Sequence, residues 1–149
     1  MRRSRLGPAF AALAALGVMS APEAASSDEV GAAERPLSLE LNRLSTESGN
    51  CRADLVIANA TEKDIDALQL DLVLFDPDGV IARRLAVQVA PLRSGRTSVR
   101  SFAIRGLACE GVGRVLLNDV AECRVGGDDV ADCIELIETS SKASIDFID

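Results

Sequence analysis

The sequence contains no histidine, no tryptophan and no tyrosine, and it has four phenylalanines. Histidine is the most common general base in enzymes and a frequent zinc ligand, so its absence disfavours both catalysis and a zinc site. Substrate clefts also tend to be lined by aromatic side chains, of which this chain has few. We therefore expect a non-catalytic protein without a cofactor or metal, whose core is filled by leucine and valine.

The chain also lacks a long hydrophobic run. Its apolar stretch, residues 6–19, is shorter than the roughly 20 residues that cross a bilayer. Arginines precede this stretch and small residues follow it, which is typical of a secretory signal peptide. We predict a signal peptide over residues 1–25, with cleavage after Ser20, Ala24 or Ala25 left open. Arg2-Arg3 resembles a twin-arginine signal, and an ordinary export signal is the alternative.

Four cysteines follow the predicted signal: Cys51, Cys109, Cys123 and Cys133. An even number of cysteines in an exported chain indicates two disulfides, and no C-x-x-C pair supports zinc binding. Three pairings are open, and we favour Cys51–Cys109 with Cys123–Cys133, because the second pair would close a short polar hairpin end. Export with disulfides predicts a periplasmic location, with no stable membrane insertion after signal cleavage.

Apolar and polar residues alternate in short runs, which predicts β-strands. The runs cover residues 37–41, 51–59, 67–75, 80–89, 97–104, 113–120 and 134–148. About seven short strands without a long amphipathic helix predict an all-β, immunoglobulin-like sandwich over residues 37–149, preceded by a flexible lead over 26–36. The apolar spacing at residues 112–121 also fits a short helical turn, so that segment is left open.

Residues 76–79, Asp-Pro-Asp-Gly, could belong to a calcium loop or to a turn. Counted as an EF-hand, the loop needs an oxygen ligand at position 5, glycine at 6 and glutamate at 12, where Val80, Ile81 and Val87 stand instead. Aspartate, proline and glycine occupy the positions that a type I turn prefers. We therefore predict a turn joining two core strands, with a weak surface calcium site as the alternative.

Two further motifs have ordinary structural interpretations. Asn59-Ala60-Thr61 matches the N-glycosylation acceptor, but asparagine also suits a turn at a strand end, which we prefer. The carboxylate pairs Asp64/Asp66 and Asp128/Asp129 are the closest approach to a glycosidase acid–base pair. Acidic clusters in exported proteins are usually solvated loops, so a cell-envelope polymer hydrolase is kept as an alternative function.

The charge distribution is the most informative feature of the sequence. The chain carries a net charge of −7, yet residues 79–109 contain no acidic residue and six arginines. One explanation is pairing with acidic neighbouring strands, which stabilises a sheet modestly. The other is a patch for an anionic partner, with Arg83, Arg84, Arg93 and Arg96 as candidate residues. Nucleic acid is excluded as a partner by export and by the acidic net charge.

Residues 50–105 resemble the small bacterial FxLYD-type domains. The resemblance rests on LVLFD at 72–76, Gly79, PLRSG at 91–95, Phe102 and Asn59. It implies an extracytoplasmic, immunoglobulin-like sandwich with no catalytic role. The whole chain, from its arginine-rich start to its last two cysteines, resembles proteobacterial exported proteins that are labelled by their twin-arginine signal.

Together these features predict an exported binding or interaction module. Its partner would be an envelope protein or an anionic envelope component. A structural or assembly accessory without a small ligand is a further alternative.

Overall fold

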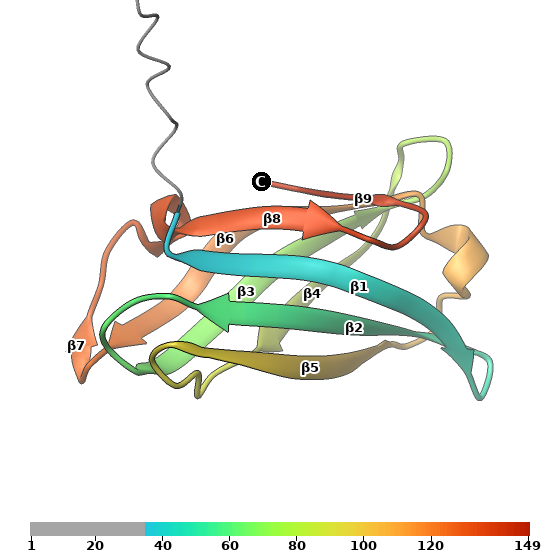
Figure 1. The fold of residues 1–149 in the computed structure, drawn as a ribbon. Coiled ribbons are helices and arrows are strands. Elements are labelled where there is room, and N and C mark those ends of the chain that lie inside the picture. Colours follow the sequence, from blue (N-terminus) through green and yellow to red (C-terminus); the bar gives the residue numbers. More distant parts are fainter. Residues whose placement is uncertain (1–34) are drawn as a thin grey trace, which may run out of the picture. The chain divides into compact units, whose positions relative to one another are not determined.

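The structure, a computed structural model, describes residues 35–149, whose strands form two sheets stacked as a sandwich (Figure 1). The strands are β1 (Leu37–Glu47), β2 (Asn50–Asn59), β3 (Ile65–Phe75), β4 (Ile81–Gln88), β5 (Arg96–Ile104), β6 (Arg114–Val125), β7 (Asp128–Asp129), β8 (Ile137–Ser141) and β9 (Asp146–Ile148). One sheet has the order β5-β2-β1-β8, and the other has the order β4-β3-β6-β7, with β9 paired to β6. The prediction of an all-β sandwich is confirmed.

The predicted signal peptide and residues 26–34 of the predicted lead lie outside the described residues. At the start of the described chain, the Arg35 guanidinium donates to the Ile137 carbonyl oxygen and pairs with Asp149. Within residues 35–149, no helix is long and apolar enough to cross a membrane.

The core lies between the two sheets and is almost entirely aliphatic. Leu68, Leu70, Leu72 and Leu74 alternate along β3, and all are at most 1% exposed. They face the buried leucines and isoleucine of β1 and β2, which are Leu37, Leu39, Leu41, Leu55 and Ile57. Each fully buried aliphatic side chain contributes about 1.5–3 kcal/mol relative to exposure, so these alternating rows hold the two sheets together.

Strand β6 occupies the segment for which the sequence left a helical turn open. Its inward residues Val115, Leu117, Val120 and Cys123 oppose the four leucines of β3. The register shifts twice within this stretch, and each shift adds one residue to β6. These bulges turn the strand's spacing of two into spacings of three, which imitate a helical stripe. A 3-10 turn, η1 (Cys109–Gly111), precedes the strand.

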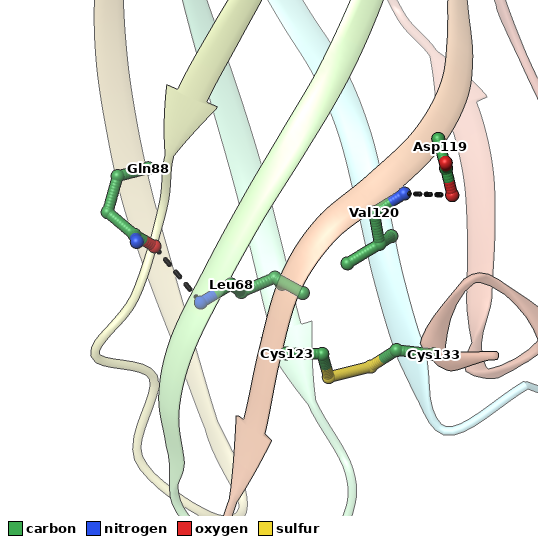
Figure 2. The surroundings of a disulfide bond; sticks show 6 residues. All are labelled: Leu68, Gln88, Asp119, Val120, Cys123 and Cys133. Carbon is green, nitrogen blue, oxygen red and sulfur yellow. Dashed lines mark hydrogen bonds between the residues drawn. A yellow bond between two sulfur atoms is a disulfide. The ribbon is translucent and has the colours of Figure 1, made fainter. Parts of the chain in front are cut away.

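The disulfides are Cys51–Cys109 and Cys123–Cys133, the pairing that the sequence favours. The first joins the start of β2 to η1. The second joins β6, the neighbour of β3, to a 3-10 turn, η2 (Cys133–Leu136) (Figure 2). Because disulfides persist in oxidising surroundings, the two bonds indicate an exported protein.

Residues 76–79 form the predicted turn between β3 and β4. The Gly79 N–H donates to the Asp76 carbonyl oxygen at 3.0 Å, and Gly79 has a φ of +81°. The Asp76 carboxylate accepts from the N–H groups of Asp78 and Val80 at 3.0 and 2.8 Å. This carboxylate therefore serves the turn itself. A side chain at Gly113 would lie 2.6 Å from the Asp76 carbonyl oxygen, so the turn packs directly against that glycine.

Candidate functional site

The acid-free segment forms one side of the sandwich. Strand β4 is the terminal strand of one sheet and β5 is the terminal strand of the other. Six arginines lie on or beside these two strands, and we call them the arginine edge: Arg83, Arg84, Arg93, Arg96, Arg100 and Arg105. Charged side chains on terminal strands discourage unwanted strand pairing, so part of this charge has a structural use.

Two of the four candidate arginines are paired within the sandwich. The Arg84 guanidinium makes a two-point contact with the Asp71 carboxylate, with one N–O distance of 2.8 Å. This contact, with a hydrogen bond from Asn118, holds the pKa of Asp71 below its usual value. Arg93 pairs with Asp64 at 3.1 Å. The internal pairing expected from the charge pattern therefore accounts for Arg84 and Arg93.

The other two candidates, Arg83 and Arg96, have no ion pair among residues 35–149. Arg105 also has none in this region, and all three side chains are exposed. Arg83 extends from β4 toward the chain that follows β5. Its Nη2 lies 3.1 Å from the position that a Cβ would take if Gly106 carried a side chain. These three guanidinium groups are the part of the arginine edge that is available to an anion.

The structure does not bring the four candidates into one cluster. Arg83 and Arg84 lie near the β3–β4 turn, opposite Leu74 and Val73. Arg93 and Arg96 lie at the other end of β4, where the chain crosses to β5. At about 3.3 Å per residue, the five residues from Arg83 to Gln88 alone span roughly 17 Å. The arginine edge is thus an extended surface and not a compact anion pocket.

The Arg100 side chain links the two strands of this edge. Its Nε donates to the Val89 carbonyl oxygen at 2.8 Å, and its Nη2 donates to the Pro91 carbonyl oxygen at 2.7 Å. The Val89 oxygen is free for this bond because Gln88 Oε1 accepts from the Leu68 N–H in its place, at 3.0 Å (Figure 2). Arg100 therefore fixes the β4–β5 connection and is not a candidate binding residue.

A charged cluster on the outer face of the β5-β2-β1-β8 sheet was not predicted from the sequence. Asp54 is 7% exposed, and its carboxylate contacts Arg43 at 2.8 Å, Arg52 at 3.4 Å and the Ser101 hydroxyl at 2.5 Å. The hydrogen bonds from Ser101 and Arg43 hold the pKa of Asp54 below its usual value. The partners come from β1, β2 and β5, so the cluster joins three neighbouring strands.

We expect Asp54→Asn to lower the free energy of unfolding by about 1–2 kcal/mol at neutral pH, since it removes charge-assisted hydrogen bonds whose arginines are solvated. Because the pKa of Asp54 is lowered by folding, this stabilisation is present above the unfolded pKa of about 4 and is lost as the pH falls below it. Urea denaturation between pH 7 and pH 3 measures this.

Asp128→Asn, at an exposed residue of β7 without an ion pair in the described region, is the matched control. It should change stability little at any pH. A difference between wild type and Asp54→Asn that stays constant down to pH 3 would contradict the role assigned to this carboxylate.

Three of the four carboxylates in the two candidate pairs make structural contacts. Asp64 accepts from the Ser94 N–H at 2.8 Å and pairs with Arg93, while Asp66 accepts from the Gly127 N–H at 2.8 Å. Asp129 pairs with Arg124 at 3.2 Å across the β6–β7 hairpin. These contacts tie loops together.

An open polar hollow of about 290 Å³ lies beside the β3–β4 turn. Asp76, Asp78, Asp146 and Arg114 line it, and the Arg114 guanidinium lies 4.9 Å from the centre of the Phe75 ring. Across residues 35–149, no group of three or more acidic or cysteine side chains is arranged to hold a metal ion.

The sandwich is similar to a solved structure, IrmA from Escherichia coli. The TM-score is 0.56 at 14% sequence identity, and the match covers 70% of this chain and 91% of that one. At this identity the likeness shows a shared fold. No protein-family model matches the chain, and no curated protein matches it.

Proposed function

We propose that the protein is a periplasmic, non-catalytic interaction module that binds an anionic partner of the cell envelope through the arginine edge. The observation that carries this proposal is the set of exposed guanidinium groups of Arg83, Arg96 and Arg105, which have no ion pair among residues 35–149. Arginine binds carboxylates and phosphates through paired N–H donors, so an anionic partner fits this surface.

The disulfides support an exported location, and the resemblance of residues 50–105 to FxLYD-type domains agrees with an extracytoplasmic module. The hydrolase alternative receives less support, since Asp64, Asp66 and Asp129 are engaged in loop contacts. A purely structural accessory would leave the exposed arginines without a binding role, which makes the two interpretations separable by experiment.

The test compares three forms of the oxidised, exported protein immobilised on a resin. These are the wild type, the triple variant Arg83→Ser/Arg96→Ser/Arg105→Ser, and the control Arg114→Ser/Arg124→Ser/Lys142→Ser, which loses the same charge elsewhere. We expect the wild type and the control to retain a component of a periplasmic and envelope extract at low salt, and the edge variant to lose it. Mass spectrometry and phosphate analysis identify what is retained.

Equal retention by all three forms would show that the arginine edge is not the binding surface. Retention of no component by the wild type would favour the structural accessory.

A further inference from the structure

Strand β4, like β5, is a terminal strand with one open side. It is hydrogen-bonded only to β3, and residues 81–84 are exposed. The Val89 N–H donates to the Leu68 carbonyl oxygen on β3 at 3.0 Å. Because backbone groups alternate along a regular strand, those of Arg83, Leu85 and Val87 point toward β3, and those of Arg84 and Ala86 point away from it. Ala82 is the extra residue of a bulge, where this alternation is broken.

No large side chain covers these outward groups. Ala86 ends at Cβ, and the Arg84 guanidinium is drawn back over its own sheet by Asp71. Arg83 extends the other way, toward Gly106. Natural proteins usually protect a terminal strand with a bulge, a proline or a projecting charge. Strand β4 has a bulge at Ala82, near its start, and two arginines whose side chains turn away from the open side. From Arg84 to Ala86 the open side has neither a bulge nor a proline.

Strand β5 is less accessible. The Cys51 N–H donates to the Leu107 carbonyl oxygen, which extends the β2–β5 alternation and makes Val99 an outward-pointing residue of β5. The Val99 carbonyl oxygen already accepts from Arg100 Nη1 at 3.1 Å. Arg100 thus blocks the middle of β5, while β4 remains free to pair with another strand.

We propose that β4 accepts an extended, acidic segment of a partner protein as an additional strand. This inference rests on the proposed function and specifies its partner and its mode of binding. Main-chain hydrogen bonds to Arg84 and Ala86 hold the segment, and alternate side chains provide selectivity. Those facing inward lie beside Arg83 and the half-buried Leu85, so the segment carries an acidic residue two positions from an apolar one.

Charge complementarity selects this occupant over a second copy of the chain. Two β4 strands paired side by side would bring Arg83 and Arg84 of each copy together in a stretch without acidic residues. An acidic strand instead supplies a carboxylate to Arg83, which has no ion pair in the described region. Backbone donors and acceptors along the free side favour a peptide over a lipid headgroup, which would use the arginines alone.

The test uses the oxidised, full exported protein and a capped octapeptide in which threonine occupies every second position and glutamate and valine alternate at the positions between, so that each glutamate stands two positions from a valine. Amide hydrogen exchange is followed by nuclear magnetic resonance as the peptide is added. We expect the N–H groups of Arg84 and Ala86 to exchange at least about tenfold more slowly, while those facing solvent on β5 are unchanged. The same peptide with N-methyl groups on alternate residues keeps its charge but cannot complete the main-chain bonds, and it should bind at least about tenfold more weakly.

Two variants make the site specific. Ala86→Pro removes one outward donor of β4 without touching the β3 ladder, and it should abolish peptide protection. Ala103→Pro does the same on the open side of β5 and should leave binding unchanged. Wild-type exchange data stand independently of either variant, so a folding defect in one of them does not decide the result.

Equal binding of the N-methylated peptide would overturn strand addition and leave the anion-binding function intact. Binding only to phosphatidylglycerol vesicles, or a peptide-independent dimer that protects β4, would also overturn it. If neither peptide nor vesicles bind, and Arg83→Ser/Arg96→Ser/Arg105→Ser retains the same envelope components as the wild type, the proposed function fails as well.

Discussion

Replacing Cys51 and Cys109 together by alanine is expected to lower the free energy of unfolding by about 4 kcal/mol. Without the bond, the unfolded chain regains the conformational entropy that closing a 58-residue loop removes. Cys51 is completely buried at the start of β2, so the bond also fixes η1 against the core. The midpoint temperature of thermal unfolding should decrease by about 10–15 °C. Chemical denaturation of the oxidised wild type and of the variant measures the difference.

The second disulfide provides the comparison. Cys123 and Cys133 are 10 residues apart, so their bond closes a much shorter loop. The same relation gives about 3 kcal/mol for its removal. We therefore expect the Cys123→Ala/Cys133→Ala variant to be the more stable of the two double variants. The opposite order would show that the β6–η2 region contributes more to stability than loop length predicts.

The strands that the sequence predicts most accurately have one face in the core throughout their length. The leucines of β3 recur at every second residue, and the structure buries each of them. The turn at 76–79 is predicted from the sequence equally well, because its aspartate and glycine satisfy local backbone geometry that needs no distant partner.

The parts that sequence reasoning missed depend on distant contacts. The predicted strand over 134–148 is divided into η2, β8 and β9, since β8 pairs with β1 in one sheet and β9 pairs with β6 in the other. No local pattern reports that the chain changes sheets between Ser141 and Asp146. The bulges of β6 likewise exist because that strand must keep pairing with β3.

The charge pattern located the arginine edge but could not separate its members. Arg84 lies opposite Val73 and is therefore a diagonal cross-strand neighbour of Asp71. This register exists only when β3 and β4 pair. Arg93 meets Asp64 because two connections between the sheets pack together. The Asp54 cluster gave one local signal, an arginine two residues earlier on the same face, but Arg43 and Ser101 come from other strands.

Asn59→Ala is expected to lower the free energy of unfolding by about 2–4 kcal/mol, because it removes several hydrogen bonds of a side chain that is 2% exposed. The amide nitrogen donates to the carbonyl oxygens of Lys63 and Leu92 at 3.0 and 3.1 Å. The amide oxygen accepts from the N–H and the hydroxyl of Thr61 at 3.0 and 2.7 Å. Thermal and urea unfolding measure the loss.

These four bonds explain why this asparagine matters more than its glycosylation motif suggests. Residues 59–64 carry the chain from one sheet to the other, and Leu92 lies in the connection that carries it back. Asn59 joins the two crossings beside the arginine edge, so its loss should loosen the Arg93–Asp64 contact as well.

Asn42→Ala, at an exposed asparagine of β1, is the control and should lower the free energy of unfolding by less than about 0.5 kcal/mol. If both variants were equally stable, the Ile65–Leu92 backbone bonds and the contacts of Ser94 with Asp64 and Thr61 would be sufficient to hold the two crossings, and amide exchange at Ser94 would then be unchanged by Asn59→Ala.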